Sequence, residues 1–435
     1  MIGNRAIWLS IPLALMAFGG GCGSLVSPAQ PPRADQRKAA VEAVFTLRQL
    51  AESKDPVVRC NAIEALSETV GAREAGVYMQ ALSDANPMVQ FAGAMALGDV
   101  KYEGAREALL AMANATGPDK RVYAAVIYAL YRLKDTSHMG DLARLLLHAE
   151  PEVRADAVLV IGKIGEPSGI DPLRQLLAAE TDPKVRLQTV ESLALLGDSR
   201  GKGNLEAYTH TRFVDEQLVA IRAIGRVRPD RWELILDDAM SEHQPMPVRV
   251  AACGAAAQLG DYSLRNYQLC VDAVENPNRL LAGRFGKERD VNPVEATMLR
   301  RLGAISLGYM NRPQAVDVLL PLLRAEDGTV RVVAAMSILR LIPAAYIAQP
   351  ETEPVKTQPA TSAATSAAAT MPSIAASEPS LPASQPAAAS SAPASAPSAP
   401  AATSAAAASE PATTLQPEGA SVPNRPKLRS SGAKD

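Results

Sequence analysis

Apolar and small residues recur in one repeated phrase that runs from residue 55 to about residue 342. Each copy starts from an anchor position that is nearly always aliphatic. Apolar or small residues follow at steps of four and eight, as in Val58, Ala62 and Leu66. This spacing places them on one face of a helix. The nine anchor positions are Val58, Val89, Val122, Val153, Val185, Glu216, Val248, Leu299 and Val330.

The distance between copies predicts how they assemble. The residue numbers of successive anchors differ by about 31 to 33, with one larger step from Val248 to Leu299. A short helical unit repeated at such a period cannot bury its apolar face alone, so the units are expected to stack. The residue four positions after the anchor is small in most copies, which would let a neighbouring helix approach closely: Ala62, Gly93, Ala157, Ala220, Ala252, Gly303 and Ala334.

Signals at the ends of each copy predict a helix hairpin. Asp55-Pro56, Asn86-Pro87 and Asp182-Pro183 fit an N-cap followed by proline at the first helical position. A glycine-containing turn is expected to close each phrase, and a second helix follows, for example from Pro172 to Glu180. We therefore predict an all-α solenoid of about nine hairpins. The glycines expected in the closing turns include Gly98, Gly165, Gly197 and Gly260.

Two copies open with D-P-x-V-R and continue with small and leucine residues at helical spacing. They are DPVVRCNAIEAL at 55–66 and DPKVRLQTVESL at 182–193. They resemble the short HEAT repeats of the phycobilisome-lyase type. The resemblance implies a HEAT-like solenoid, which we expect over residues 33–348. It implies no particular activity, because such repeats occur in scaffolds, lyases and hydroxylases.

The N-terminal residues indicate export. Residues 1–21 contain a single Arg5 and a short apolar stretch that is too short to span a bilayer, as expected of a signal peptide. Cys22 follows Gly20 and Gly21 and resembles the lipidated cysteine of bacterial lipoproteins, although Gly19 stands where an aliphatic residue is usual. Ordinary cleavage after a small-x-small site is the alternative. Lipidation would make residues 22–32 a short membrane tether.

The C-terminal segment, residues 349–435, has a different composition. Ala, Pro, Ser and Thr make up most of the stretch from 351 to 420. Such a segment cannot bury enough apolar surface to offset the backbone entropy of ordering, so we expect a disordered tail. Its basic end could contact an anionic envelope polymer, and a solvated spacer is the alternative.

Composition excludes several classes of function. The chain has 44 basic and 46 acidic residues, a net charge of −2, which provides no excess positive charge for nucleic acid. The four histidines stand apart in the sequence, with no zinc-type spacing and no His-Glu pair of the kind that iron-binding hydroxylases with this repeat carry. We therefore expect no metal, no cofactor and no nucleic-acid partner.

An arginine follows the anchor in many copies, including Arg59, Arg154 and Arg186. These side chains could form a ladder for an anionic ligand. Alternatively, they could pair with acids such as Asp55 and Asp182, three residues before the anchors, and stabilise the stack.

Three further features are candidate sites. The long interval from Val248 to Leu299 contains an insertion near 276–295, and insertions in solenoids often form a binding loop. Its alternative is a surface loop without a role. Cys253 and Cys270 fall on apolar helix faces and could form a disulfide in an oxidising compartment, or simply pack in the core. The candidate loop residues are Arg279, Arg284, Phe285, Lys287 and Arg289.

Together these features favour a non-enzymatic lipoprotein, a scaffold that binds another protein on its concave surface and catalyses no reaction. We expect a monomer on the outer side of the cytoplasmic membrane, or in the outer membrane or periplasm. The alternative is a lyase-like or other enzyme acting on a chromophore or polymer bound in the groove. A cavity with buried carboxylates would favour this alternative.

Overall fold

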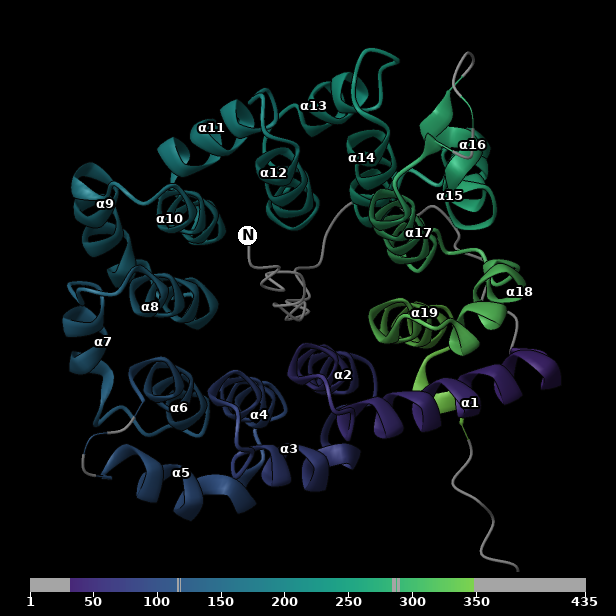
Figure 1. Ribbon diagram of the computed structural model, residues 1–435. Helices are drawn as coiled ribbons and strands as arrows, with labels where there is room; N and C mark the ends of the chain where they lie inside the picture. The colour runs from purple at the N-terminus through teal and green to yellow at the C-terminus, as the bar shows by residue number, and fades with distance from the viewer. Residues whose placement is uncertain (1–31, 116, 118, 284–286, 288–289, 348–435) are drawn as a thin grey trace, which may run out of the picture. The chain divides into compact units, whose positions relative to one another are not determined.

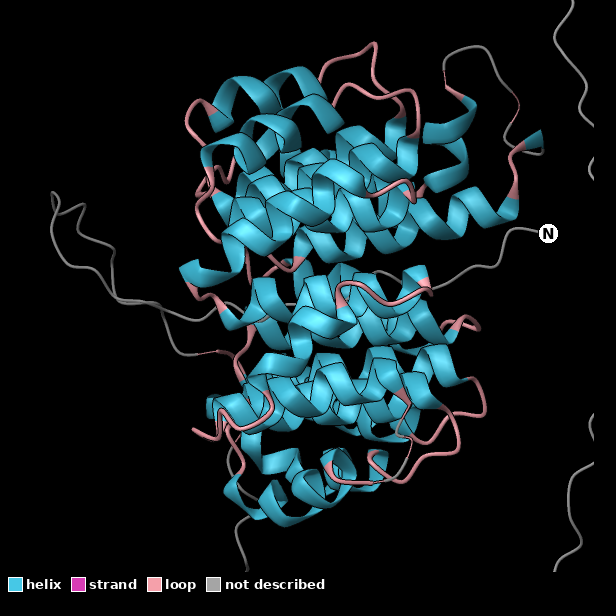
Figure 2. Ribbon diagram, turned by 90° about the vertical axis from the view of Figure 1, so that its left-hand side faces the viewer, coloured by secondary structure: helices cyan, strands magenta, loops and turns pink. Residues whose placement is uncertain are grey.

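The computed structural model describes residues 32–115, 117, 119–283, 287 and 290–347. These residues form nineteen α-helices with short 3-10 segments between them, and they contain no strand (Figure 2). This confirms the predicted all-α solenoid. Within the same residues, no helix is both long enough and apolar enough to cross a membrane.

Nine helices carry the nine anchors and form the inner layer. Their anchors are buried, except in the sixth helix, where Glu216 is only partly buried and Leu218 and Ile221 supply the apolar face. The inner helices are α2 (Pro56–Thr69), α4 (Pro87–Asp99), α6 (Lys120–Arg132), α8 (Pro151–Ile164), α10 (Pro183–Leu195), α12 (Val214–Val227), α14 (Met246–Gln258), α17 (Pro293–Leu307) and α19 (Gly328–Leu341).

A second set of helices covers the inner layer from outside. The chain enters through α1 (Ala34–Ala51), and an outer helix then follows each inner helix up to α17 (Figure 1). These outer helices are α3 (Ala75–Ala81), α5 (Arg106–Ala113), α7 (Met139–Leu145), α9 (Ile170–Ala179), α11 (Ser199–Tyr208), α13 (Trp232–Ala239), α15 (Leu264–Glu275), α16 (Pro277–Ala282) and α18 (Ala315–Leu319). The 3-10 segments are η1 (Gly71–Glu74), η2 (Glu103–Ala105), η3 (Pro167–Gly169), η5 (Leu320–Arg324) and η6 (Ala344–Tyr346).

The predicted helix starts are confirmed. The Asp55 side chain accepts a hydrogen bond from the Val57 amide, and Asn86 and Asp182 cap α4 and α10 in the same way. Proline follows each cap at a position where its missing N–H removes no helical hydrogen bond. The caps therefore define where an inner helix begins.

One predicted turn glycine has a different role. Gly98 lies inside α4, where a Cβ would come within 2.9 Å of the Tyr128 ring and of the Ala129 Cα on α6. Gly165 and Gly197 do lie in turns, with φ of 79° and 87°, values that favour glycine. Gly98 is therefore a contact residue between neighbouring inner helices, because its missing side chain makes room for Tyr128.

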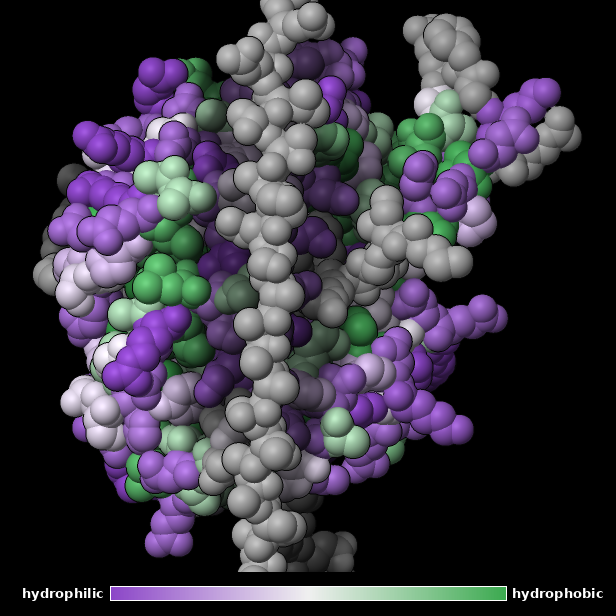
Figure 3. Space-filling model, turned by 60° about the vertical axis from the view of Figure 1, so that its left-hand side comes forward, coloured by the Kyte–Doolittle hydropathy of each residue, from purple (hydrophilic) through white to green (hydrophobic). Residues whose placement is uncertain are grey.

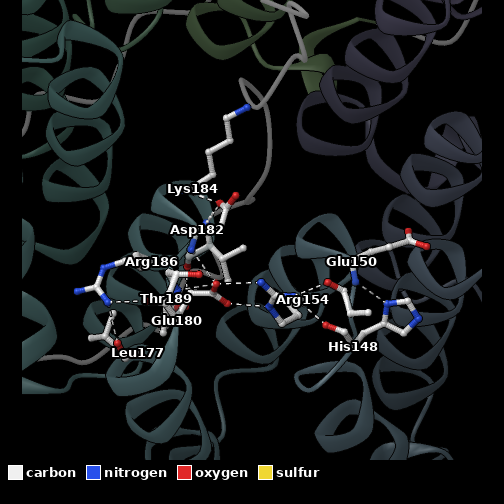
Figure 4. Close-up of polar contacts among 12 residues, drawn as sticks. His148, Glu150, Arg154, Leu177, Glu180, Asp182, Lys184, Arg186 and Thr189 are labelled. Carbon is white, nitrogen blue, oxygen red and sulfur yellow. Dashed lines mark hydrogen bonds and ion pairs between the residues drawn. The ribbon is translucent and has the colours of Figure 1, made fainter. Parts of the chain in front are cut away.

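The arginine ladder holds the stack together. Arg154 donates two hydrogen bonds to Glu180 and others to the His148 and Ala149 carbonyls (Figure 4). One side chain thus joins the loop before α8 to the loop before α10. The hydrogen bond from Arg154 lowers the pKa of Glu180 to about 2. The prediction of a structural role was right, but the expected acid was wrong: Asp182 caps its helix, and the partner comes from the end of the outer helix.

Arg59 and Arg186 make comparable contacts. Arg59 donates to both carboxylate oxygens of Asp84 and to the Ser53 carbonyl. Arg186 donates to the Leu177 and Glu180 carbonyls (Figure 4). Because these guanidinium groups are engaged by the connections of the stack, they are not a ladder for a ligand.

The inner helices close into a ring. Figure 1 shows them end-on, with α19 returning to lie beside α2 and α1. A Cβ on Gly328, at the start of α19, would lie 2.9 Å from the Val58 side chain on α2, so the last and first inner helices are in direct contact. The sequence indicated stacking but did not predict this closure.

Polar contacts join the two ends of the array as well. Arg340 on α19 donates to Glu68 on α2 at 2.8 Å, and the Gln36 side chain on α1 donates to the Pro313 carbonyl. Arg73 donates to the Ala344 carbonyl. Core residues from α1 to α19 form one continuous cluster. The first and last repeats are therefore neighbours in the same sense as any other consecutive pair.

Replacing Gly328 by leucine tests the closure. The added side chain must displace Val58, so we expect the free energy of unfolding to fall by about 1 to 3 kcal/mol and hydrogen exchange to rise in α1 and α2. Gly203→Leu on α11 is the control, because a Cβ there meets nothing within 4 Å. Equal exchange in α1 and α2 of both variants would contradict a closed ring.

Candidate functional site

A cavity of about 100 Å³ lies among the inner helices. Its lining residues come from α2, α4, α8, α12, α14, α17 and α19, and from Tyr309 just after α17. Helices from opposite sides of the ring thus share one cavity (Figure 1). Its apolar lining includes Ala92, Met95, Leu218, Ala251, Leu302, Ile305 and Met336.

Elementary geometry limits what the ring can enclose. With neighbouring helix axes about 8 to 10 Å apart, a circle of nine helices measures about 25 Å between opposite axes. A helix with its side chains is about 10 to 12 Å across, which leaves roughly 15 Å at the centre. Side chains fill most of this space, because the cavity measures only about 100 Å³, so it suits one side chain or a small ligand rather than a helix. A folded domain is too large, so the concave surface is not an open groove.

The charged residues that line the cavity occupy equivalent positions in their repeats. Positions six and ten after the anchor face the cavity: Glu64 and Glu68 on α2, and Arg222 and Arg226 on α12. The same two positions place Asp99, Lys163 and Arg340 on this wall. Since positions three, six and ten share one face of a helix, the cavity face lies beside the apolar face that packs the ring. None of these residues was among the sites predicted from the sequence, although aligning the copies at positions six and ten identifies them.

Opposite charges face each other between α2 and α12. Figure 1 shows these helices on opposite sides of the ring. Glu64 interacts electrostatically with Arg222, and Glu68 with Arg226. Arg226 also forms an ion pair with Glu191 on α10, and its burial lowers its pKa to about 10. Arg222 and Arg226 thus face two glutamates across the cavity, and Arg226 has a third glutamate as its ion-pair partner.

The Arg340 side chain lies at the seam of the ring. Its Nη2 is 2.6 Å from the Glu68 carboxylate, and its guanidinium carbon lies 4.2 Å from the centre of the Tyr309 ring. A guanidinium over an aromatic face is stabilised by the ring quadrupole. Arg340 thus joins the last repeat to the first and also lines the cavity.

A second network joins α4, α6 and α8. Lys163 donates to one Asp99 oxygen at 2.8 Å, and the Tyr128 hydroxyl donates to the other at 2.5 Å. The Lys163 ammonium also lies 5.1 Å from the centre of the Tyr128 ring. Because the two charges are nearly fully buried, each requires the other. This network holds Asp99 and Lys163 in place where α4 and α8 line the cavity.

Glu64 differs from the other cavity acids. Burial raises its pKa to about 8, and the positive charges of Lys163 and Arg222 only partly oppose the rise. The part of the chain that the structure describes offers it no hydrogen-bond donor. Its carboxyl group is therefore largely protonated at neutral pH, which is the state required of a general acid.

Several residues singled out from the sequence lie elsewhere. Cys22, Arg284, Phe285 and Arg289 fall outside the described residues. Lys287 is exposed, and Arg279 on α16 donates to Asp272 at 3.2 Å. The inserted segment thus supplies α16 on the outer side, and neither Arg279 nor Lys287 lines the cavity.

Cys253 and Cys270 pack against each other in the core. Both are buried free thiols in this structure, and the Cys270 thiol is in hydrogen-bond contact with Cys253. Burial, together with Cys253, raises the pKa of Cys270 well above its usual range. A disulfide between them stays a prediction, and neither residue lines the cavity.

Two carboxylates lie closer to histidines than the sequence suggested. Asp238 is 3.6 Å from His210 and 3.8 Å from His243, and Asp141 is 3.9 Å from His138. Among the described residues, however, no three His, Cys, Asp or Glu side chains are grouped so that they could hold a metal ion.

Comparison with known proteins agrees with the repeat architecture. A HEAT-repeat family model matches residues 46–116 and 114–194. Residues 46–194 are therefore HEAT repeats. The hairpins from α12 to α19 continue the same inner and outer layers beyond the matched region. No curated protein matches the sequence.

Two solved structures are distantly similar to this chain. Human deoxyhypusine hydroxylase in complex with glycerol is 16% identical, with a TM-score of 0.32, over 71% of this chain and 98% of that one. An engineered protein is 15% identical, with a TM-score of 0.17, over 71% of this chain and 97% of that one.

A Glu64→Gln variant tests the buried carboxyl. Raising a carboxyl pKa from 4.5 to about 8 on folding means that the folded protein holds a proton the unfolded chain has lost. Wild-type stability should therefore fall as pH rises through this window, by up to about 1.4 kcal/mol per pH unit. Glutamine does not titrate, so the variant should not lose stability as the pH rises.

We expect Glu64→Gln to be more stable than wild type at pH 8.5, and the difference to shrink at pH 5, measured by urea unfolding. Glu107→Gln, which changes an exposed carboxylate on α5, should show no such trend. A stability difference independent of pH would contradict the protonated Glu64.

Proposed function

We propose that this protein is an exported, lipid-anchored binding protein of the cell envelope that holds a side chain or chain end of another protein within its HEAT ring. One observation carries the proposal: the central cavity combines charged groups with an apolar lining. A polypeptide side chain or chain end offers complementary groups to both. The expected scaffold role is kept, but the binding surface is the interior of the ring.

The size and rigidity of the ring support this choice of ligand. The cavity of about 100 Å³ admits one side chain or the end of a chain, but not a helix. Each inner helix is held by neighbours on both sides, so the wall is preorganised and binding costs little ordering entropy. The lining holds four cations and three acids, and several of them are already paired, so the cavity favours a single anionic group such as a polypeptide carboxylate over a polyanion.

The face of the molecule drawn in Figure 3 gives less support for a large partner interface. On the face in Figure 3, apolar residues occur in small groups among hydrophilic ones, wherever the segments drawn in grey do not cover it. Extended apolar patches are the usual mark of a protein interface. The cavity is therefore the better candidate site.

One observation favours a second function, chemistry on a molecule held in the cavity. Glu64 is a largely protonated carboxyl that faces Arg222 across the ring, with Tyr309 also on the wall. An acid with a raised pKa beside a cation is a common arrangement in active sites. Loss of turnover, but not of binding, in Glu64→Gln would favour an enzyme over a binding protein.

Photo-cross-linking in intact cells tests the binding site. A benzoyl-phenylalanine at Gln258 or Ile305, on two cavity-lining helices, should capture the same partner protein. The same group at Leu147 or Leu234, two exposed outer positions, should not. Capture only from the outer positions would show that the partner binds outside the ring.

The anchor is tested separately by Cys22→Ala. Without a lipidated cysteine, we expect the protein to leave the membrane fraction and to lose incorporated lipid label. Cys60→Ala is the matched control, because Cys60 is a buried thiol in α2. Unchanged fractionation and no lipid label in the wild type would rule out the lipoprotein.

A further inference from the structure

The outer face of α1 has an unusual composition. The opposite face packs into the core through Ala40, Ala43 and Leu47. On the outer face, Val41 is 51% exposed and Phe45 is 66% exposed, the largest value among the exposed aromatic residues described. Exposing a phenylalanine and a valine one turn apart leaves apolar area in water that a partner surface would cover.

Two cations lie one turn before this pair. Arg37 and Lys38 are exposed, and they precede Val41 by four and three residues, so they share its side of the helix. We name Arg37, Lys38, Val41 and Phe45 the α1 stripe. Neither cation forms an ion pair within the described part of the chain, whereas the acids of α1 are engaged: Asp35 pairs with Arg33, and Glu42 with Arg324.

We propose that the α1 stripe docks on the surface of an anionic phospholipid bilayer. Aromatic and aliphatic side chains flanked by arginine and lysine are typical of helices that lie in the interface, with the cations at the headgroups and the apolar residues below them. The charge of the stripe complements anionic lipid, and its apolar area is the part that would enter the bilayer.

The length of the preceding chain also favours a membrane. Ala34 lies twelve residues after Cys22, and twelve residues span at most about 40 Å. A lipid on Cys22 would therefore keep α1 close to the bilayer and raise its effective concentration there. This step rests on the proposed anchor. The charge and apolar exposure of the stripe are independent of it.

The small size of the stripe argues against a protein partner at this place. A stable protein interface needs about 1,000 Å² or more of buried surface, whereas one phenylalanine contributes at most about 250 Å². A bilayer contact needs much less, because each cation near an anionic surface contributes about 1 kcal/mol and each apolar side chain that enters the interface adds to it.

Docking would also orient the ring. In Figure 1, α1 is seen from the side along the rim, while the inner helices are seen end-on. With the outer face of α1 on the bilayer, the inner helices would lie roughly parallel to the membrane plane. The axis of the ring would then run along the membrane surface.

The test uses residues 22–435 with Cys22→Ala, which lack both the signal and the lipid, so it is independent of the anchor. Co-sedimentation with vesicles of phosphatidylcholine and phosphatidylglycerol, in a molar ratio of about 7 to 3, is compared with phosphatidylcholine alone. We expect binding to the anionic vesicles only, reduced about tenfold by Val41→Ser with Phe45→Ser and at least as much by Arg37→Ser with Lys38→Ser.

Leu264→Ser is the matched control, because it removes an equally exposed apolar side chain from α15. As a second readout, acylation of Lys38 should fall on anionic vesicles, while acylation of the exposed Lys134 should not. An equal effect of the control, no binding of the parent chain, or a dimer lost in Phe45→Ser would overturn membrane docking. The fractionation of Cys22→Ala reports on the anchor whatever the vesicles show.

Discussion

Contact between the last repeat and the first is the constraint on which the rest of this structure depends. Gly328 meets Val58, and Arg340 pairs with Glu68, so α19 and α2 pack as any other neighbours do. In an open solenoid the terminal units each lack one neighbour and need a polar cap. Here closure supplies the missing neighbour, and α1 covers the seam from outside.

Closure also converts a surface into an interior. Side chains at positions six and ten after the anchor would face solvent on an open array, but in the ring they face one another. Charges there lose much of their hydration and have to be compensated. Asp99 with Lys163, Glu68 with Arg340 and Glu191 with Arg226 provide that compensation. Glu64 responds instead by keeping its proton.

The repeat itself could be predicted from the sequence because its determinants are local. The buried anchors, the Asp and Asn caps and the small residues at the middle position act within one helix or between adjacent ones. The Arg154 partner was less accessible, since Glu180 lies 26 residues away at the end of the outer helix. Gly98 was misassigned because a glycine that admits a neighbouring helix looks the same in sequence as one that ends a helix.

Closure and the cavity could not be predicted in this way, because whether nine hairpins meet depends on the sum of small rotations between units, and no single residue encodes that sum. Glu64 and Arg222 are far apart in the chain, so nothing local links them, although the repeated register would have identified both as members of one helix face.

A ring of this kind restricts how the protein can evolve. Nine equivalent units divide a full turn into steps of about 40° each. An open solenoid tolerates the gain or loss of a repeat, because only its length changes. In this molecule a tenth unit would require every joint to change its angle, or the seam to separate. The number of repeats is therefore effectively fixed, and new sequence is accommodated as it is between α15 and α17, by growth outward from the ring.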